Sequence, residues 1–290
     1  MKNIFIVTDF SEASQNAGRY AVEMAKYFNA NVFLFHAYQV PVQVPESYFV
    51  YSTEDVWANV KSQLEAEAVS INPDKLVNVE ICGGVGLPVN LITEEVDKRE
   101  ADLIICGMKG QGKTFRRIFG STTTALSRKS EIPMIVVPEN ASFQPPKNIA
   151  LANDMDPDTS ALTYQLLKEL GEKFVSKLSV VWVVDEGIDA DKEMRFRPKS
   201  FINELKDLDP VLEFPSGSNI TSALDGFIKD HSIDLMAIIP HKHDMIGRLM
   251  TESVTKKMLF HTHIPMLILP QKKKGEMANE EKEISLDKTV

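Results

Sequence analysis

The chain has 290 residues, of which 43% are hydrophobic, and it carries a formal net charge of −9 at pH 7. This length predicts two domains, each with its own hydrophobic core. The negative charge argues against binding to nucleic acid or to an anionic membrane surface. Cys82 and Cys106 form no C-x-x-C pair and suit a reducing compartment. Since the sequence shows neither a signal-peptide core nor an apolar run of membrane-spanning length, we expect a cytoplasmic protein.

Short apolar segments alternate with amphipathic segments in the first half of the chain. Ala13, Ala17, Ala21 and Met24, for example, recur at the spacing of one helix face. The strands that we expect are Asn3–Thr8, Val32–Ala37, Leu76–Cys82, Leu103–Cys106 and Pro133–Val137, and the helices are Ser11–Phe28, Thr53–Ser70, Pro88–Arg99 and Ser121–Ser130. This alternation predicts an α/β fold, in which helices cover both faces of a parallel sheet.

The second half repeats this order of elements. Three junctions carry the repeat: Ala101–Ile105 recurs as Ile233–Ala237, Glu131–Pro138 recurs as His263–Pro270, and Asp9 after the first strand recurs as Asp154. The strands expected in the second half are Asn148–Ala152, Leu178–Val184, Val211–Phe214, Leu235–Ile239 and Met266–Leu269. The chain is therefore predicted to contain two copies of one five-stranded unit.

The repeat sets the expected domain boundaries. We predict a first domain over residues 1–142 and a second, degenerate domain over residues 143–272, shortened between Glu186 and Leu205. Residues 273–290 are rich in lysine and glutamate with few apolar residues, which predicts a disordered tail.

A glycine-rich segment follows the fourth expected strand of the first half. Gly107, Gly110, Gly120 and Ser121 form the pattern G-x2-G-x9-G-S. Glycine permits positive φ and a close approach of the backbone to a ligand. The free N–H groups of a helix that begins near Ser121 attract an anion. The segment therefore predicts a phosphate-binding site.

The same segment also matches a rival motif. Gly107, Gly112, Lys113 and Thr114 fit the Walker A pattern of P-loop NTPases, and Val180–Asp185 resembles the strand that ends in a magnesium-binding acid in such enzymes. The repeat argues against this interpretation, because Val180–Asp185 corresponds to the second strand of the first copy. An ATP-hydrolysing enzyme, either P-loop-like or a slow ATPase, remains the alternative hypothesis.

The duplicated unit and its glycine pattern resemble the universal stress protein family in its tandem, two-domain form. The resemblance extends from Asn3 to Pro270. It implies a Rossmann-like sheet with strand order 3-2-1-4-5 and a crevice at the carboxyl ends of strands one and four. It also implies that Asp9 binds the ribose and that the backbone at Ala37 holds the nucleoside. A second role for Asp9 is to cap the helix that starts near Ser11, and both roles can hold together.

The resemblance implies an ATP-binding sensor or signalling module of the cytosolic stress response, with nucleotide in the first domain. Mg²⁺ would be held mainly by the phosphates. No catalytic residue can be identified, so at most slow ATP hydrolysis or self-phosphorylation is expected. The expected nucleotide-binding residues are Thr8, Asp9, Ala37, Gly107, Lys109, Gly110, Gly120, Ser121 and Thr122.

The second copy departs from the glycine pattern. We expect Pro240 at the position of Gly107 and Glu252 at the position of Gly120. Proline lacks a backbone N–H group, and a carboxylate repels phosphate. We therefore expect the second domain to keep the fold without the nucleotide. The family resemblance further implies an intramolecular pseudo-dimer of the two domains through their fifth strands, and a possible homodimer.

The histidines do not predict a metal site. His36 lies on the second expected strand and is predicted to be buried and hydrogen-bonded. Among the late histidines His231, His241, His243, His261 and His263, two H-x-H pairs fall at opposite ends of expected strands. Those ends are ~15 Å apart for five residues at about 3.3 Å each, so the pairs are not expected to share one metal. Either pair alone remains a candidate for weak metal binding.

Overall fold

We describe a computed structural model of the chain. The structure describes residues 1–40, 52–108, 121–153, 159–187, 200–240 and 263–272. The chain forms two compact units, one of Met1–Pro145 with His263–Pro265 and the other of Pro146–Thr262 with Met266–Val290. Within the described ranges, no helix is both long enough and apolar enough to cross a membrane.

The first unit contains a five-stranded parallel sheet. Its strands are β1 (Asn3–Val7), β2 (Asn31–Tyr38), β3 (Val79–Val85), β4 (Leu103–Met108) and β5 (Met134–Pro138), in the order β3-β2-β1-β4-β5. Strand β1 is central and pairs with both β2 and β4, so that Val7 lies opposite Phe35 and Cys106. This is the predicted strand order.

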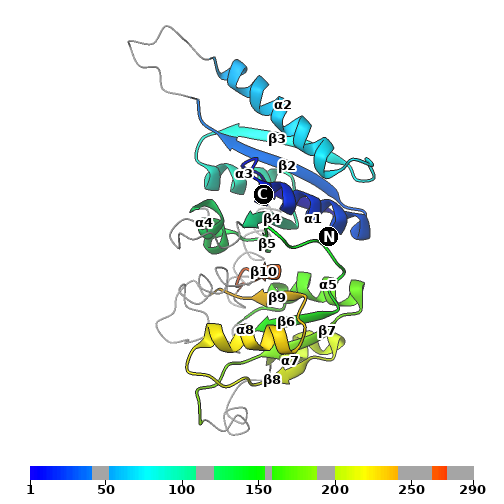
Figure 1. Cartoon of the computed structure of the whole chain (residues 1–290), viewed down its shortest axis with the longest axis vertical. Helices are drawn as coiled ribbons and strands as arrows, with labels where there is room; N and C mark the ends of the chain where they lie inside the picture. Colours follow the sequence, from blue (N-terminus) through cyan, green and yellow to red (C-terminus); the bar gives the residue numbers. More distant parts are fainter. Residues whose placement is uncertain (41–51, 109–120, 154–158, 188–199, 241–262, 273–290) are drawn as a thin grey trace, which may run out of the picture. The chain divides into compact units, whose positions relative to one another are not determined.

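Helices cover both faces of this sheet (Figure 1). The helices are α1 (Glu12–Phe28), α2 (Thr53–Ile71), α3 (Pro88–Lys98) and α4 (Ser121–Lys129). Helix α1 packs against α2, and α3 packs against α4. Right-handed crossovers produce this division, because the connections that contain α1 and α2 run across the sheet in one direction and those that contain α3 and α4 run in the other.

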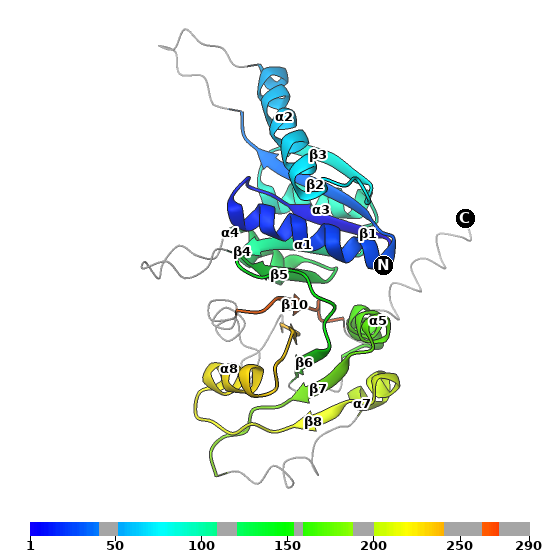
Figure 2. The same cartoon turned by 45° about the vertical axis from the view of Figure 1, so that its right-hand side comes forward.

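The second unit repeats the architecture in a shorter form. Its strands are β6 (Asn148–Ala152), β7 (Lys177–Val181), β8 (Val211–Glu213), β9 (Leu235–Ile238) and β10 (Met266–Ile268), in the order β8-β7-β6-β9-β10. Its helical segments are η1 (Ala161–Tyr164), α5 (Gln165–Phe174), α7 (Ser200–Leu205), η2 (Lys206–Leu208) and α8 (Ile220–Asp230). Within this unit, α8 lies on one side of the sheet, and α5 and α7 lie on the other (Figure 2).

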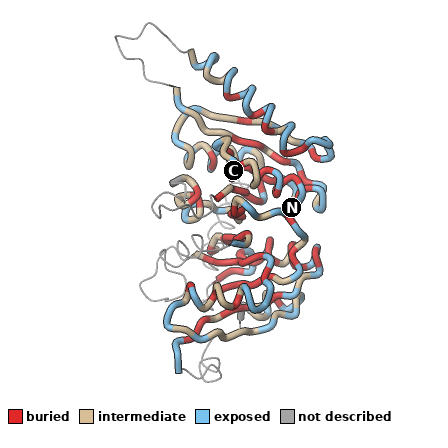
Figure 3. Tube along the Cα trace, in the orientation of Figure 1, coloured by how far each residue is buried: buried red, intermediate tan, exposed pale blue. Residues whose placement is uncertain are grey.

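Buried residues concentrate along the central strands of each unit (Figure 3). Every residue of β5 is buried, as is every residue of β9. Apolar strands covered on both faces give such continuous buried runs, which explains why the sequence shows no alternation there. The α/β class with two parallel five-stranded sheets is therefore confirmed.

Two strands differ from the prediction by three residues at one or both ends, and the other strands differ by at most two. The third strand is Val79–Val85 instead of Leu76–Cys82, because Leu76 is 69% exposed and Asn72 binds the carbonyl of Val77 in the preceding turn. Strand β7 ends at Val181 instead of Val184. Its neighbour β6 ends at Ala152, opposite Val181. The residues after Val181 therefore have a hydrogen-bonded neighbour only on the side of β8.

Candidate nucleotide-binding site

A pocket lies where the central strands of the first unit end. Strands β1 and β4 are neighbours, but the chain leaves β1 for α1 on one face and leaves β4 for α4 on the other. Such a divergence opens a crevice at the carboxyl ends of the two strands. The volume of the pocket is about 270 Å³. The residues that line it are Val7, Thr8, Asp9, Ser11, Ala13, Ser14, His36, Ala37, Pro88, Cys106, Gly107, Thr122 and Thr123.

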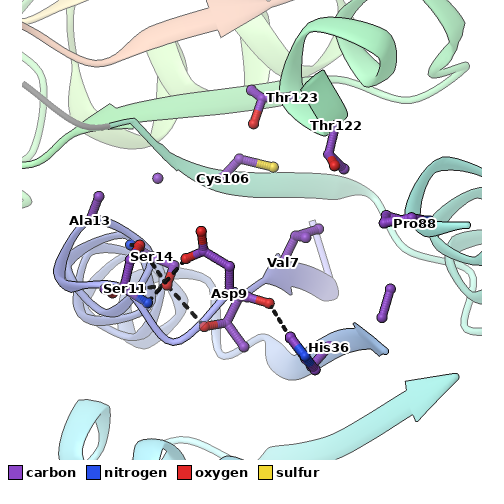
Figure 4. Close-up of a pocket in the computed structure, with 13 residues that line it drawn as sticks. Val7, Asp9, Ser11, Ala13, Ser14, His36, Pro88, Cys106, Thr122 and Thr123 are labelled. Atoms are coloured by element: carbon purple, nitrogen blue, oxygen red, sulfur yellow. Dashed lines mark hydrogen bonds between the residues drawn. The ribbon is translucent and has the colours of Figure 1, made fainter. Parts of the chain in front are cut away.

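The turn between β1 and α1 is held by side-chain bonds (Figure 4). The Asp9 carboxylate accepts a hydrogen bond from the Ser11 N–H at 3.0 Å, and Ser11 caps α1 by accepting from the Ser14 N–H at 3.3 Å. Phe10 has a φ of 62° and donates its N–H to Thr8 Oγ1 at 2.9 Å. Asp9 thus supports the helix start, as its capping role predicts, while its side chain remains exposed.

Gly107 is in very close contact with α1. A Cβ atom at this position would lie 2.2 Å from the carbonyl oxygen of Ala13 and 2.7 Å from the backbone nitrogen of Ser14. Real Cβ contacts are much longer, so the first turn of α1 fits against β4 only because residue 107 has no side chain. The sequence predicted this glycine for its approach to phosphate. The structure adds a packing reason that involves no ligand.

His36 and Cys106 form part of the wall. His36 Nδ1 lies 2.7 Å from the carbonyl oxygen of Thr8, which requires Nδ1 to carry the proton and donate it. His36 is therefore hydrogen-bonded, as predicted, although it is only half-buried. The Cys106 thiol is buried, and loss of solvation raises its pKa to about 12 although the Thr123 hydroxyl lowers it. Cys106 is therefore a neutral thiol at physiological pH.

The structure brings five of the predicted site residues to the pocket wall, namely Thr8, Asp9, Ala37, Gly107 and Thr122. Ser121 is the first residue of α4. Lys109, Gly110 and Gly120 lie outside the described residues, so the glycine pattern can be followed only at its two ends. In the view of Figure 4, Thr122 and Thr123 extend from α4 on the other side of β4 from Asp9.

Sequence reasoning did not assign Ser14, Pro88, Cys106 or Thr123 to the site. Two of them had a usable signal. Ser14 lies three residues after Ser11 and shares its helix face. Cys106 ends the expected strand Leu103–Cys106, where the topology already placed the crevice. Pro88 and Thr123 reach the pocket through helix packing that the sequence does not display.

The corresponding end of the second unit is built from other residues. Asn153 follows β6, as Thr8 follows β1, and both residues are buried, but Asn153 donates its side-chain amide to the Tyr164 hydroxyl at 3.2 Å. The strand pairing corrects the expected position of Pro240. Ile238 lies opposite Ala152 as Cys106 lies opposite Val7, so Ile239 corresponds to Gly107, and Pro240 corresponds to Met108. Residues 154–158 and 241–262, which include Asp154, Glu252 and three of the late histidines, lie outside the described residues.

Comparison with known proteins identifies relatives for this unit. The family model described as the universal stress protein family matches residues 1–138. A universal stress protein of Methanocaldococcus jannaschii is 30% identical over 146 residues, which is 47% of this chain and 81% of the relative. The stress response protein NhaX of Bacillus subtilis is 26% identical over 159 residues, 46% of this chain and 96% of the relative.

A solved structure supports the fold of the whole chain. A universal stress protein from Archaeoglobus fulgidus has a TM-score of 0.67 at 14% identity, and the match covers 93% of this chain and 98% of that one. The order of the strands, the pocket at their carboxyl ends and the sequence matches agree. The chain belongs to the universal stress protein family.

Proposed function

We propose that the protein is a cytoplasmic stress-response sensor or signalling module that binds ATP in its first unit and not in its second. The observation that carries the proposal is the pocket at the ends of β1 and β4, with Asp9 just after β1 and Gly107 on the neighbouring strand β4. A carboxylate is a good acceptor for ribose hydroxyls. The start of α4 supplies hydroxyl groups and a helix N-terminus suited to phosphate.

The residues fit a nucleoside in their chemistry as well as in their position. Val7, Ala37 and Pro88 give the pocket apolar surface, on which a base can pack. One oxygen of Asp9 accepts from Ser11, and a carboxylate has further acceptor sites for a ligand. We propose that Mg²⁺ enters with ATP and is held mainly by the phosphates.

Calorimetric titration of the full chain with ATP and Mg²⁺ tests the proposal. We expect one site per chain. Asp9→Asn should weaken binding by about 10- to 100-fold, because it replaces a charged acceptor worth about 1.5–3 kcal/mol while keeping an oxygen for Ser11. The matched control is Asp154→Asn, its counterpart in the sequence repeat, which should bind as the wild type does. Two equivalent sites, or equal losses in both variants, would contradict the proposal.

ATP hydrolysis is the alternative, and it requires a group that activates water. His36 lines the pocket, and because its Nδ1 donates to a backbone carbonyl, its Nε2 is the ring nitrogen that can accept a proton. We propose binding without rapid turnover, since the sequence assigns His36 no catalytic role. A steady-state turnover assay separates the two hypotheses, since multiple turnovers that are lost in Asp9→Asn would establish an enzyme.

The proposal includes an assembly. We propose that the two units form an intramolecular pseudo-dimer through their fifth strands, and that two chains can form a homodimer. A linker gives the two units of one chain a high effective concentration. Residues 1–142 expressed alone should then dimerise or aggregate. A stable monomer by light scattering at high concentration would contradict this assembly.

A further inference from the structure

Helix α2 carries a carboxyl group within its apolar stripe. The buried residues of this helix are Val60, Leu64, Glu67 and Ile71, at the spacing of one helix face. Glu67 is only 4% exposed, and its Oε1 has no hydrogen-bond partner among the described residues. An unpaired carboxylate oxygen in such a place is costly and requires a specific explanation.

A chain of hydroxyl groups connects Glu67 to the candidate site. Glu67 Oε2 lies 3.0 Å from Thr8 Oγ1, and Thr8 Oγ1 lies 3.0 Å from Ser14 Oγ. Ser14 Oγ donates to the carbonyl oxygen of Ser11 at 2.9 Å. Thr8, Ser11 and Ser14 all line the pocket. The hydroxyl chain therefore connects a buried acid with the turn that holds Asp9.

The number of protons in this chain determines the state of Glu67. Because the Ser14 hydroxyl donates to Ser11, Ser14 Oγ can only accept from Thr8, whose single proton is then used. Thr8 Oγ1 already accepts from the Phe10 N–H, and its remaining lone pair faces Glu67. When Glu67 is ionised, one of the two contacts of Thr8 Oγ1, to Ser14 or to Glu67, therefore lacks a proton, whereas a protonated Glu67 donates to Thr8 and satisfies both contacts. In that state Oε1 is a neutral carbonyl oxygen, which costs less to bury than half of a carboxylate.

On balance, the surroundings of Glu67 raise its pKa. Burial raises the pKa of Glu67 above its ordinary value, the Thr8 hydrogen bond lowers it, the negative charge of Asp9 raises it, and Arg19 on α1 lowers it. An anion bound beside Asp9 adds a further negative charge. Like charges favour the neutral form of an acid, so the bound anion strengthens proton binding at Glu67.

We propose that Glu67 is the proton-binding group of this pocket, and that its carboxyl group takes up a proton from solvent when a nucleotide anion binds beside Thr8 and Asp9. The inference rests on the proposed function, because it assigns the anion to that pocket. Glu67 acts through Thr8 and Ser14 and is a positioning residue. Its consequence is a nucleotide affinity that rises as the pH falls.

Calorimetry measures the proton directly. The protein is titrated with ATP and Mg²⁺ between pH 6 and 8, once in phosphate and once in Tris buffer. The two buffers have different heats of ionisation, so the difference between the two binding heats gives the number of protons taken up. Wild type should take up more protons than Glu67→Gln, which mimics the protonated acid, and the protons of ATP itself cancel in this difference. Above the pKa of Glu67, wild-type affinity should fall relative to Glu67→Gln by at most about tenfold per pH unit, the limit for one proton.

The matched control is Glu65→Gln on the exposed side of the same helix, where Glu65 is 58% exposed. Glu65→Gln should take up as many protons as wild type. Equal uptake by wild type and Glu67→Gln would overturn the inference. Failure of wild type to bind ATP would instead refute the proposed function, and with it the nucleotide linkage.

A second measurement needs no ligand. Because the pKa of Glu67 is raised in the folded state, its contribution to stability is full below the ordinary glutamate pKa of about 4.3 and is lost as the pH rises through the folded value. The unfolding free energy of wild type should show this loss in urea titrations, and that of Glu67→Gln should not. If Glu67→Gln does not fold, a ¹³C carboxyl titration of wild type replaces it, and an ordinary pKa for Glu67 would overturn the inference.

Discussion

The two units of this chain are alike at the amino ends of their strands. In the first, Asp102 precedes β4 and accepts a hydrogen bond from the Asn3 N–H at 2.9 Å. In the second, Asp234 precedes β9 and accepts from the Asn148 N–H at the same distance. The side chains of Asn3 and Asn148 both donate to backbone carbonyls before the fourth strand of their unit. The same contacts therefore join the first strand to the start of the fourth strand in both units.

At the carboxyl ends of the same strands the units differ. Helix α1 begins at Glu12, soon after β1 ends at Val7, and its first turn fits against Gly107. In the second unit the helical segment η1 begins only at Ala161, after β6 ends at Ala152. The two units are thus alike at the amino ends of these strands and differ at the carboxyl ends, where we propose that the first unit binds its ligand. The following variants test this division.

The largest effect is expected from copying the second unit into the glycine motif. Gly120→Glu places a carboxylate at the predicted phosphate position, where repulsion of ~4 kcal/mol is expected at 4 Å and an effective dielectric of about 20. ATP affinity should fall by about a thousandfold in calorimetry, with an unchanged circular dichroism spectrum. Lys113→Ala is the comparison and should weaken binding only modestly.

The opposite ranking would favour the rival motif. In a P-loop the lysine contacts the β- and γ-phosphates, and its loss is severe. Abolished binding in Lys113→Ala with retained binding in Gly120→Glu would therefore replace the stress-protein site with a P-loop. Both positions lie outside the described residues, so this prediction depends on the sequence pattern.

A slightly smaller effect is expected from Gly107→Pro. The proline ring meets the carbonyl of Ala13 and removes a backbone N–H from β4, at a cost of about 3 kcal/mol or more. Urea unfolding should show a destabilised first unit. The comparison is Pro240→Gly, two residues after β9, which should alter stability by less than about 1 kcal/mol. A stable Gly107→Pro would show that α1 moves away from β4 readily.

The smallest effect is expected from Tyr164→Phe in the second unit. The ring stays buried, and the loss is one hydrogen bond to the Asn153 side chain. Unfolding free energy should fall by about 1 kcal/mol, with no change in ATP affinity. Reduced ATP binding in this variant would break the assignment of the nucleotide to the first unit.

Much of the fold follows from sequence because buried strands appear as apolar runs between helical segments. The end of β3 was missed for a definable reason. Gly83 and Gly84 resemble turn residues, yet a Cβ at Gly83 would lie 2.7 Å from the ring of Trp57 on α2. That glycine is required by packing between a helix and a strand, which local sequence does not reveal.

The candidate site was predictable where topology places it. Asp9 and Ala37 were expected from the family resemblance, and together with Thr8 they line one pocket near the ends of β1 and β2. Glu67 was not expected, although a glutamate between Leu64 and Ile71 interrupts an apolar stripe. The pattern shows that such a residue is buried. Only the fold shows that it faces Thr8.

The rate at which a thiol reagent modifies Cys106 can report whether this pocket is occupied. Cys106 lines the cavity, while the chain's second cysteine, Cys82, is buried in β3 of the same unit. A thiol reagent modifies such residues at a rate set by how often the surrounding structure opens. Ligand that fills the pocket should slow the modification of Cys106 and leave that of Cys82 nearly constant. The ratio of the two modification rates therefore reports how far the pocket is filled, and it requires no engineered residue.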